Sequence, residues 1–164
     1  MKPKFVALVI ALFVVLFGSL IWSSNKAKQG KVTAEVALSS RDAALLCTSD
    51  AQTIYHIHPA LHIVINGVNE PIPAGIGLTP TCMRSIHTHE ADNVLHVESP
   101  VEKQFTLGDF FAVWGKDFSK DKIMDTTTTP TTEIVVTVNG TKVDTFENTV
   151  LKDLDQIVIS YQNK

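Results

Sequence analysis

The chain has 164 residues, with 14 basic and 17 acidic side chains, six histidines and a formal net charge of −3. The charge is uneven, because residues 1–31 carry five lysines and no acidic residue, which leaves residues 32–164 with a formal charge of −8. A domain this rich in carboxylates repels phosphate backbones, which argues against nucleic acid as a partner. About 130 residues suffice for one ordinary domain with its own core.

Residues 5–22 form an uninterrupted apolar run without a charge, FVALVIALFVVLFGSLIW. The run reaches the length of a membrane-spanning helix, about 17–25 residues. It is longer than the apolar core of a typical signal peptide, about 7–15 residues, and no clear A-x-A cleavage site follows it. We therefore expect residues 1–24 to form an uncleaved membrane anchor, with a cleaved signal peptide as the alternative, and residues 25–31 to form a polar tether.

The compartment of the remaining chain is inferred from its cysteines. Lysines lie on both sides of the apolar run, so the positive-inside rule does not orient it. Two cysteines follow, and disulfides belong to oxidising compartments. We therefore expect a single-pass protein of the cell membrane whose C-terminal domain, residues 32–164, lies outside the cytoplasm. A membrane protein is a candidate partner.

The central part of this domain has the composition of β-strands. Residues 54–65, IYHIHPALHIVI, are rich in β-branched and aromatic side chains, and Pro59 either divides this stretch or places it at a sheet edge. The dipeptide Asn66-Gly67 predicts a tight hairpin. Further short strands are expected at residues 68–73, 85–88 and 93–98.

One strong helix is expected, beginning after Thr106. Thr106 can cap its N-terminus, and Asp109 three residues later completes an arrangement like a capping box. An apolar stripe at helical spacing marks its buried face, and Gly115 fits the position after the last turn. A second Asn-Gly hairpin and further strands are expected at residues 133–138, 139–140, 142–146 and 157–161. The predicted fold class is α+β and β-rich, with one small sandwich- or barrel-like domain and one main helix.

All six histidines lie between residues 56 and 96, a density far above what a structural core needs. Side chains on a strand alternate between its two faces. Histidines two residues apart on extended backbone therefore share a face, while the apolar residues between them share the opposite one. The sets that this alternation places together are His56, His58 and His62; His87 and His89; and His96 and Glu98.

Such faces can bind a transition metal, because imidazole is the commonest metal ligand and three or four ligands must converge at about 2.0–2.2 Å. The first candidate site combines an H-x-H pair with ligands of the next strand: His87, His89, His96 and Glu98. Further ligands or a second site could come from His56, His58 and His62. Either Glu90 or Asp92 could accept a hydrogen bond from the second nitrogen of a ligating imidazole and so orient that ring. Copper or zinc is the expected metal, and iron or manganese would also suit these ligands.

Cys47 and Cys82 flank the histidine cluster. A disulfide between them would close a loop of about 35 residues and stabilise the fold by roughly 3–4 kcal/mol. The alternative is thiolate ligation, which would favour Cu(I) or zinc. Neither C-x-x-C nor C-x-x-H spacing is present, which favours the disulfide over ligation and over free thiols.

Several motifs resemble a widespread group of small, mostly uncharacterised extracytoplasmic proteins of archaea and bacteria. The pieces that carry the resemblance are YHIHPALHIVING, PIPAGIGL, CMRSIHTHEADNVLHVESP and FTLGDFFAVWG, which with the final IVISY cover most of residues 47–161. The resemblance implies that the histidines, both cysteines and the LGDFF…WG helix belong to one unit. The chain is also weakly similar to cupin barrels, in which H-x-H and a later His and Glu bind metal. Here the Glu does not follow H-x-H at the usual cupin spacing, and the second cupin motif is missing.

Common catalytic motifs such as G-x-S-x-G, the P-loop and H-E-x-x-H are absent from the sequence. We therefore expect a membrane-anchored extracytoplasmic protein that binds copper or zinc through its histidine cluster. One alternative is a metal-dependent enzyme, in which three histidines leave a coordination position open and Glu98 or Glu90 acts as the base. The other is a disulfide-stabilised interaction module whose histidines are incidental and bind no metal.

Overall fold

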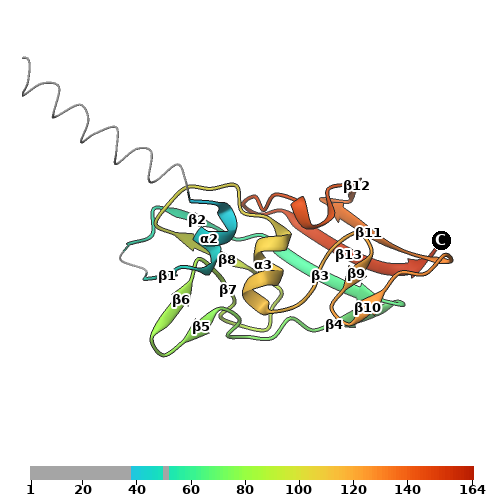
Figure 1. Cartoon of the computed structure of the whole chain (residues 1–164), viewed down its shortest axis with the longest axis horizontal. Helices are drawn as coiled ribbons and strands as arrows, with labels where there is room; N and C mark the ends of the chain where they lie inside the picture. The colour runs from blue at the N-terminus through green and yellow to red at the C-terminus, as the bar shows by residue number, and fades with distance from the viewer. Residues whose placement is uncertain (1–37, 50–51) are drawn as a thin grey trace, which may run out of the picture. The chain divides into compact units, whose positions relative to one another are not determined.

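The structure is a computed structural model that describes residues 38–49 and 52–164, of which Ser40–Lys164 form one compact unit (Figure 1). The predicted membrane anchor at residues 1–24, the tether at residues 25–31 and residues 32–37 of the predicted domain lie outside the described residues. In the two described ranges, none of the helices has the length and apolar character that a membrane span requires.

The compact unit is β-rich with one main helix among its described residues, which confirms the predicted α+β class. Its helical elements are α2 (Ser40–Leu45), α3 (Leu107–Trp114) and the 3₁₀ turn η2 (Phe146–Asn148). The described strands form four sheets (Figure 1). The predicted sandwich- or barrel-like arrangement of these strands stays a prediction.

The largest sheet has the order β12-β11-β13-β3-β4, formed by β3 (Ala60–Ile65), β4 (Val68–Glu70), β11 (Thr132–Val138), β12 (Thr141–Val143) and β13 (Gln156–Asn163). One three-stranded sheet has the order β2-β8-β7, formed by β2 (Tyr55–Ile57), β7 (Ile86–His87) and β8 (His96–Ser99). The other has the order β1-β6-β5, formed by β1 (Cys47–Thr48), β5 (Leu78–Thr79) and β6 (Cys82–Arg84). Strands β9 (Lys122–Ile123) and β10 (Thr126–Thr127) form a two-stranded ribbon.

The centre of the five-stranded sheet is a parallel pair between β3 and β13, two segments far apart in the sequence. Leu61 lies opposite Ile157 and Ile63 lies opposite Ile159, and all four side chains are buried. Strand β3 turns back into β4 at the first predicted hairpin, and β11 turns back into β12 at the second. Both Asn-Gly turns have positive φ at each residue, as a tight hairpin requires: 51° and 82° at residues 66–67, and 52° and 79° at residues 139–140. The hairpin predictions are therefore confirmed.

Helix α3 has the predicted caps at both ends. The Thr106 hydroxyl accepts from the backbone N–H of Asp109 at 3.3 Å, and the Asp109 carboxylate accepts from the Thr106 N–H at 3.1 Å. Gly115 ends the helix with a φ of 73°. Arg41 of α2 also donates to the Asp109 carboxylate at 2.8 Å, which ties α2 to the start of α3. The buried apolar face of α3 includes Leu107, Phe110 and Phe111.

The small sheet β2-β8-β7 has one apolar face and one polar face. Ile57, Val97 and Ile86 form a single cross-strand row, and all three side chains are buried. Helix α3 lies against β7 (Figure 1), so this sheet is part of the core of the unit. Because side chains alternate along each strand, the residues next to this row project from the opposite face. These neighbouring residues include His56, His87 and His96.

Candidate metal centre

The polar face of the sheet β2-β8-β7 brings four of the predicted site residues together. The antiparallel register pairs His56 of β2 with Glu98 of β8, and His96 of β8 with His87 of β7. Directly opposed side chains in such a sheet have Cβ atoms about 4.5–5.5 Å apart. His96 and Glu98 share one strand and its polar face. Three strands therefore present imidazoles and one carboxylate to the same space.

His87 has a ring whose orientation is fixed by the main chain. Its side chain is fully buried, and its ring Nδ1 lies 2.9 Å from the backbone carbonyl oxygen of Arg84. A carbonyl only accepts, so Nδ1 carries a proton, and Nε2 is the ring nitrogen through which His87 could bind a metal. This Nε2 lies 3.1 Å from Nε2 of His89. Two nitrogens on one tetrahedral ion are about 3.3 Å apart, so the separation suits chelation.

The carboxylate of Glu98 lies among these rings. Its Oε1 atom is 3.1 Å from Nε2 of His56, 3.6 Å from Nδ1 of His96 and 4.0 Å from Nε2 of His87. Glu98 is only 8% exposed, so it is not a solvated surface acid. A carboxylate at this depth needs a cationic or hydrogen-bonding partner, such as a metal ion or a protonated imidazole.

His96 carries a buried nitrogen without a hydrogen bond. Among the described residues, its Nδ1 atom is one of the few buried side-chain polar atoms that lack a partner. The Glu98 oxygen at 3.6 Å is beyond hydrogen-bond length. Burial lowers the pKa of His96 below its usual value, and the neighbouring histidine rings lower it further against the opposing effect of Glu98. A lowered pKa favours the neutral ring of His96, the state in which imidazole binds a metal.

Two overlapping groups of side chains in the described part of the chain could each hold a metal ion. Within each group, the ligand atoms all lie within 4.8 Å of one another. The first group is the predicted first site, His87, His89, His96 and Glu98. The second is His56, His58 and His96. In the second group, the ring centroid of His58 is 4.4 Å from that of His56 and 4.8 Å from that of His96.

His62 is not a member of either group. Pro59 separates β2 from β3, so the alternation that begins at His56 does not continue to His62. Strand β3 pairs with β4 and β13, not with the strands that carry the other histidines. His62 instead lines a separate pocket together with Glu70. The common face expected for His56, His58 and His62 is therefore not formed, because the proline moves the third residue into another sheet.

The acids predicted to orient the rings have other surroundings. The Asp92 carboxylate accepts from the backbone N–H of Val94 at 3.0 Å and so closes a turn, and Glu90 is exposed. The group that orients His87 is the main-chain carbonyl of Arg84. Every residue type has such a carbonyl, so the sequence contains no signal for this role.

Thr88, between the two histidines of the H-T-H segment, was not predicted to matter for the site. It is fully buried, and its hydroxyl donates to the Pro73 carbonyl at 2.8 Å and accepts from the Ile76 N–H at 3.0 Å. Its own N–H donates to the Ile76 carbonyl at 3.1 Å, and its carbonyl accepts from the Gly75 N–H at 2.8 Å. These four bonds fix the backbone between the rings of His87 and His89. The only sequence signal for this arrangement was the glycine-rich segment PAGIG, since glycines often mark a close approach of two backbones. Here a Cβ on Gly77 would lie 2.6 Å from the Ile86 carbonyl oxygen.

Replacing Thr88 by valine keeps the shape of the side chain and removes its hydroxyl. The Pro73 carbonyl and the Ile76 N–H lose a buried partner, so the free energy of unfolding should fall by about 1–3 kcal/mol. Affinity for metal should fall by about tenfold, because the rings lose a fixed backbone. Urea denaturation and a metal titration measure the two effects. The control is Thr141→Val on the exposed strand β12, where stability should change by no more than about 0.5 kcal/mol. Unchanged metal affinity in Thr88→Val would show that the hydrogen bonds of the Thr88 hydroxyl do not position His87 and His89.

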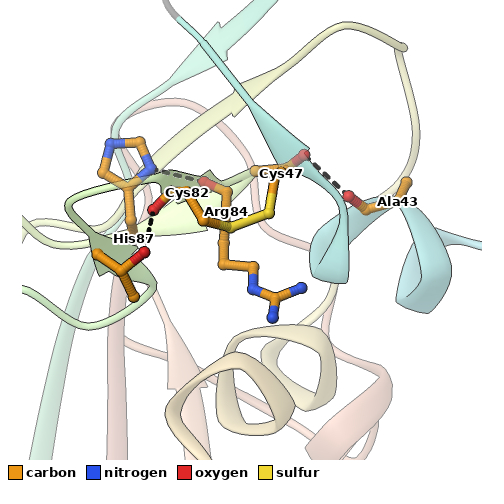
Figure 2. Close-up of a disulfide and its surroundings, with 7 residues drawn as sticks. Ala43, Cys47, Cys82, Arg84 and His87 are labelled. Atoms are coloured by element: carbon orange, nitrogen blue, oxygen red, sulfur yellow. Dashed lines mark hydrogen bonds between the residues drawn. A yellow bond between two sulfur atoms is a disulfide. The ribbon is translucent and has the colours of Figure 1, made fainter.

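Cys47 and Cys82 form a disulfide, with their Cα atoms 5.0 Å apart (Figure 2). The structure thus has the bridge and not the alternative of thiolate ligation. Strands β1 and β6 pair beside it, with Cys47 opposite Arg84. Figure 2 shows that β6 carries both the bridged Cys82 and Arg84, whose carbonyl accepts from His87. The disulfide therefore anchors the short strand whose Arg84 carbonyl orients the buried His87 ring.

Comparison of the chain with protein-family models, curated proteins and solved structures finds no match. The resemblances drawn from the motifs, to the extracytoplasmic group and to cupins, stay predictions.

Proposed function

We propose that the protein binds copper or zinc through the histidine cluster of a domain held outside the cytoplasm by an N-terminal membrane anchor. The observation that carries this proposal is the group formed by His87, His89, His96 and Glu98, whose ligand atoms lie within 4.8 Å of one another. Three nitrogens and one oxygen are a common set of transition-metal ligands. They come from two paired strands and from His89, the second residue after β7, which gives the group a rigid support.

Two features of the rings support a metal ion over incidental surface histidines. The Nε2 lone pair of His87 is aimed toward His89, because the Nδ1 proton is held by the Arg84 carbonyl. The buried Nδ1 of His96 lacks a hydrogen bond in the described structure, and a bound metal ion would give this nitrogen a partner. Incidental histidines on a wet strand face would point into solvent and would not bury a carboxylate among themselves.

The ligand count supports binding rather than catalysis at this position. Four protein ligands fill a tetrahedral shell, whereas catalytic zinc sites keep one position open for water or substrate. The proposed role is therefore capture, delivery or structural use of the metal beside the membrane. A membrane protein would be the natural recipient or partner.

The donor atoms also narrow the choice of metal. Both cysteine sulfurs are taken up by the disulfide, so the site offers no thiolate, the soft ligand that Cu(I) prefers. Imidazole and carboxylate suit Zn(II) and Cu(II). The disulfide further supports an oxidising compartment, as expected for a domain outside the cytoplasm.

The test is the metal content of the full-length chain, purified without a histidine tag and analysed by mass spectrometry after reconstitution with copper or zinc and dialysis. We expect stoichiometric metal in the wild type and loss of most of it in a His87→Ala/His89→Ala double variant. The matched control is His62→Ala, which removes a histidine outside both ligand groups and should leave the metal content unchanged.

Absence of metal from the wild type after reconstitution with copper, zinc and iron would contradict the proposal. Full retention of metal by the double variant would do the same. The first result would leave the disulfide-stabilised interaction module as the remaining function, and the second would show that the metal is bound by residues other than His87 and His89.

A further inference from the structure

The histidine cluster contains more ligands than a single ion can take. Six side chains fall into the two groups described above, and a tetrahedral ion takes four of them. His56 and His58 lie outside the first group but within reach of His96. These two rings therefore define a second position beside the first, on the β2 side of the sheet.

Glu98 lies between the two positions. Its Oε1 is 3.1 Å from Nε2 of His56 on one side and 4.0 Å from Nε2 of His87 on the other. The shorter distance is close to the separation of two ligands on one tetrahedral ion, about 3.3 Å. A carboxylate has two oxygens and about four lone-pair sites, so it can bind two ions at once. A neutral imidazole has one lone pair, so His96 can serve only one of them.

We propose, resting on the function proposed above, that the cluster is a two-metal centre bridged by the carboxylate of Glu98. An inner ion is held by His87, His89 and His96, and an outer ion by His56 and His58. Two-metal sites hold their ions about 3.5–4 Å apart, a span that one carboxylate covers. Two divalent cations at this distance repel each other, and the buried negative charge of Glu98 between them offsets that repulsion.

The two positions differ in exposure, which gives them different roles. The His87 side chain is fully buried, whereas the His56 side chain is 49% exposed. The backbone N–H of His58 donates to the Asp153 carboxylate at 2.8 Å, which fixes the chain where it leaves β2. The outer ion has three protein ligands, so water or an incoming ligand can take its open position. The inner ion is therefore the retained one, and the outer ion is the exchangeable one.

The experiment is a titration of the metal-free, untagged full-length chain with Cu(II), followed by electron paramagnetic resonance. The first equivalent should give the spectrum of an isolated copper ion. The second should add little to this signal and should produce a half-field transition, because two Cu(II) ions about 4 Å apart couple magnetically. A His56→Ala/His58→Ala variant should bind the first equivalent alone, without coupling, while His62→Ala should behave as the wild type does.

Glu98→Gln tests the bridge itself. It should still bind the first ion through the three histidines, but more weakly, and it should lose the coupled signal and bind the second ion with at least about tenfold lower affinity. A coupled signal of unchanged size in Glu98→Gln would overturn the bridging role.

Two further outcomes separate this inference from the proposed function. A wild type that binds one copper ion, retained in full by His56→Ala/His58→Ala, would overturn the two-metal centre and leave metal binding established. A wild type that binds neither copper nor zinc would overturn both.

Discussion

Replacing His87 by alanine should lower the affinity for the inner ion by about 100-fold or more, which is roughly 3 kcal/mol of binding free energy. His87 is the ligand with the most fixed geometry, because its ring is fully buried and its Nδ1 proton is held by the Arg84 carbonyl. Little conformational entropy is lost when such a ring binds a metal. His89 is exposed, so His89→Ala should cost less, about tenfold.

Competition with a chromophoric chelator measures these affinities, and His62→Ala is the control with the same change outside the cluster. His87→Ala also removes a buried ring, so the circular dichroism spectrum of each metal-free variant should first show that it is folded. Equal losses of affinity in His87→Ala and His62→Ala would contradict the assigned ligand set.

Removing the disulfide with Cys47→Ser/Cys82→Ser should lower the free energy of unfolding by roughly 3–4 kcal/mol. The bridge joins residues 35 apart in the sequence, and reopening a loop of this length restores that much entropy to the unfolded chain. Metal affinity of the folded variant should also fall, by about tenfold, because β6 carries the Arg84 carbonyl that orients His87.

Denaturant titration of the metal-free proteins measures the loss of stability, and the wild type under a phosphine reductant provides the matched comparison. The double variant and the reduced wild type should lose a similar amount of unfolding free energy. A change in stability of less than about 1 kcal/mol in both would show that the bridge contributes little to this fold.

Features fixed by neighbouring residues could be predicted from the sequence. The Asn66-Gly67 turn needs positive φ at both positions, and few residue pairs other than this one adopt it readily. Thr106 and Asp109 satisfy the first backbone groups of α3 without help from distant parts of the chain. The pairing of His87 with His96 was predictable for a similar reason, because a short connection joins two antiparallel strands.

Features that depend on distant segments could not be predicted. The pairing of His56 with Glu98 depends on a register between strands far apart in the sequence. The parallel pairing of β3 with β13 places His62 in another sheet, and Leu61 and Ile63 of β3 are buried opposite Ile157 and Ile159 of this C-terminal strand. Alternation along a strand shows which residues share a face, but not which strand lies opposite, and a proline between two strands ends that alternation.

X-ray absorption at the zinc edge tests the central claim most directly, on the full-length untagged chain loaded with one equivalent of zinc. The predicted first shell consists of nitrogen and oxygen at about 2.0–2.2 Å, with the multiple-scattering pattern of about three imidazoles and no sulfur. In His87→Ala/His89→Ala the imidazole contribution should fall, while in His62→Ala it should stay the same. A shell of oxygens without imidazole, or one that is identical in all three proteins, would contradict the claim that this histidine cluster is a metal site.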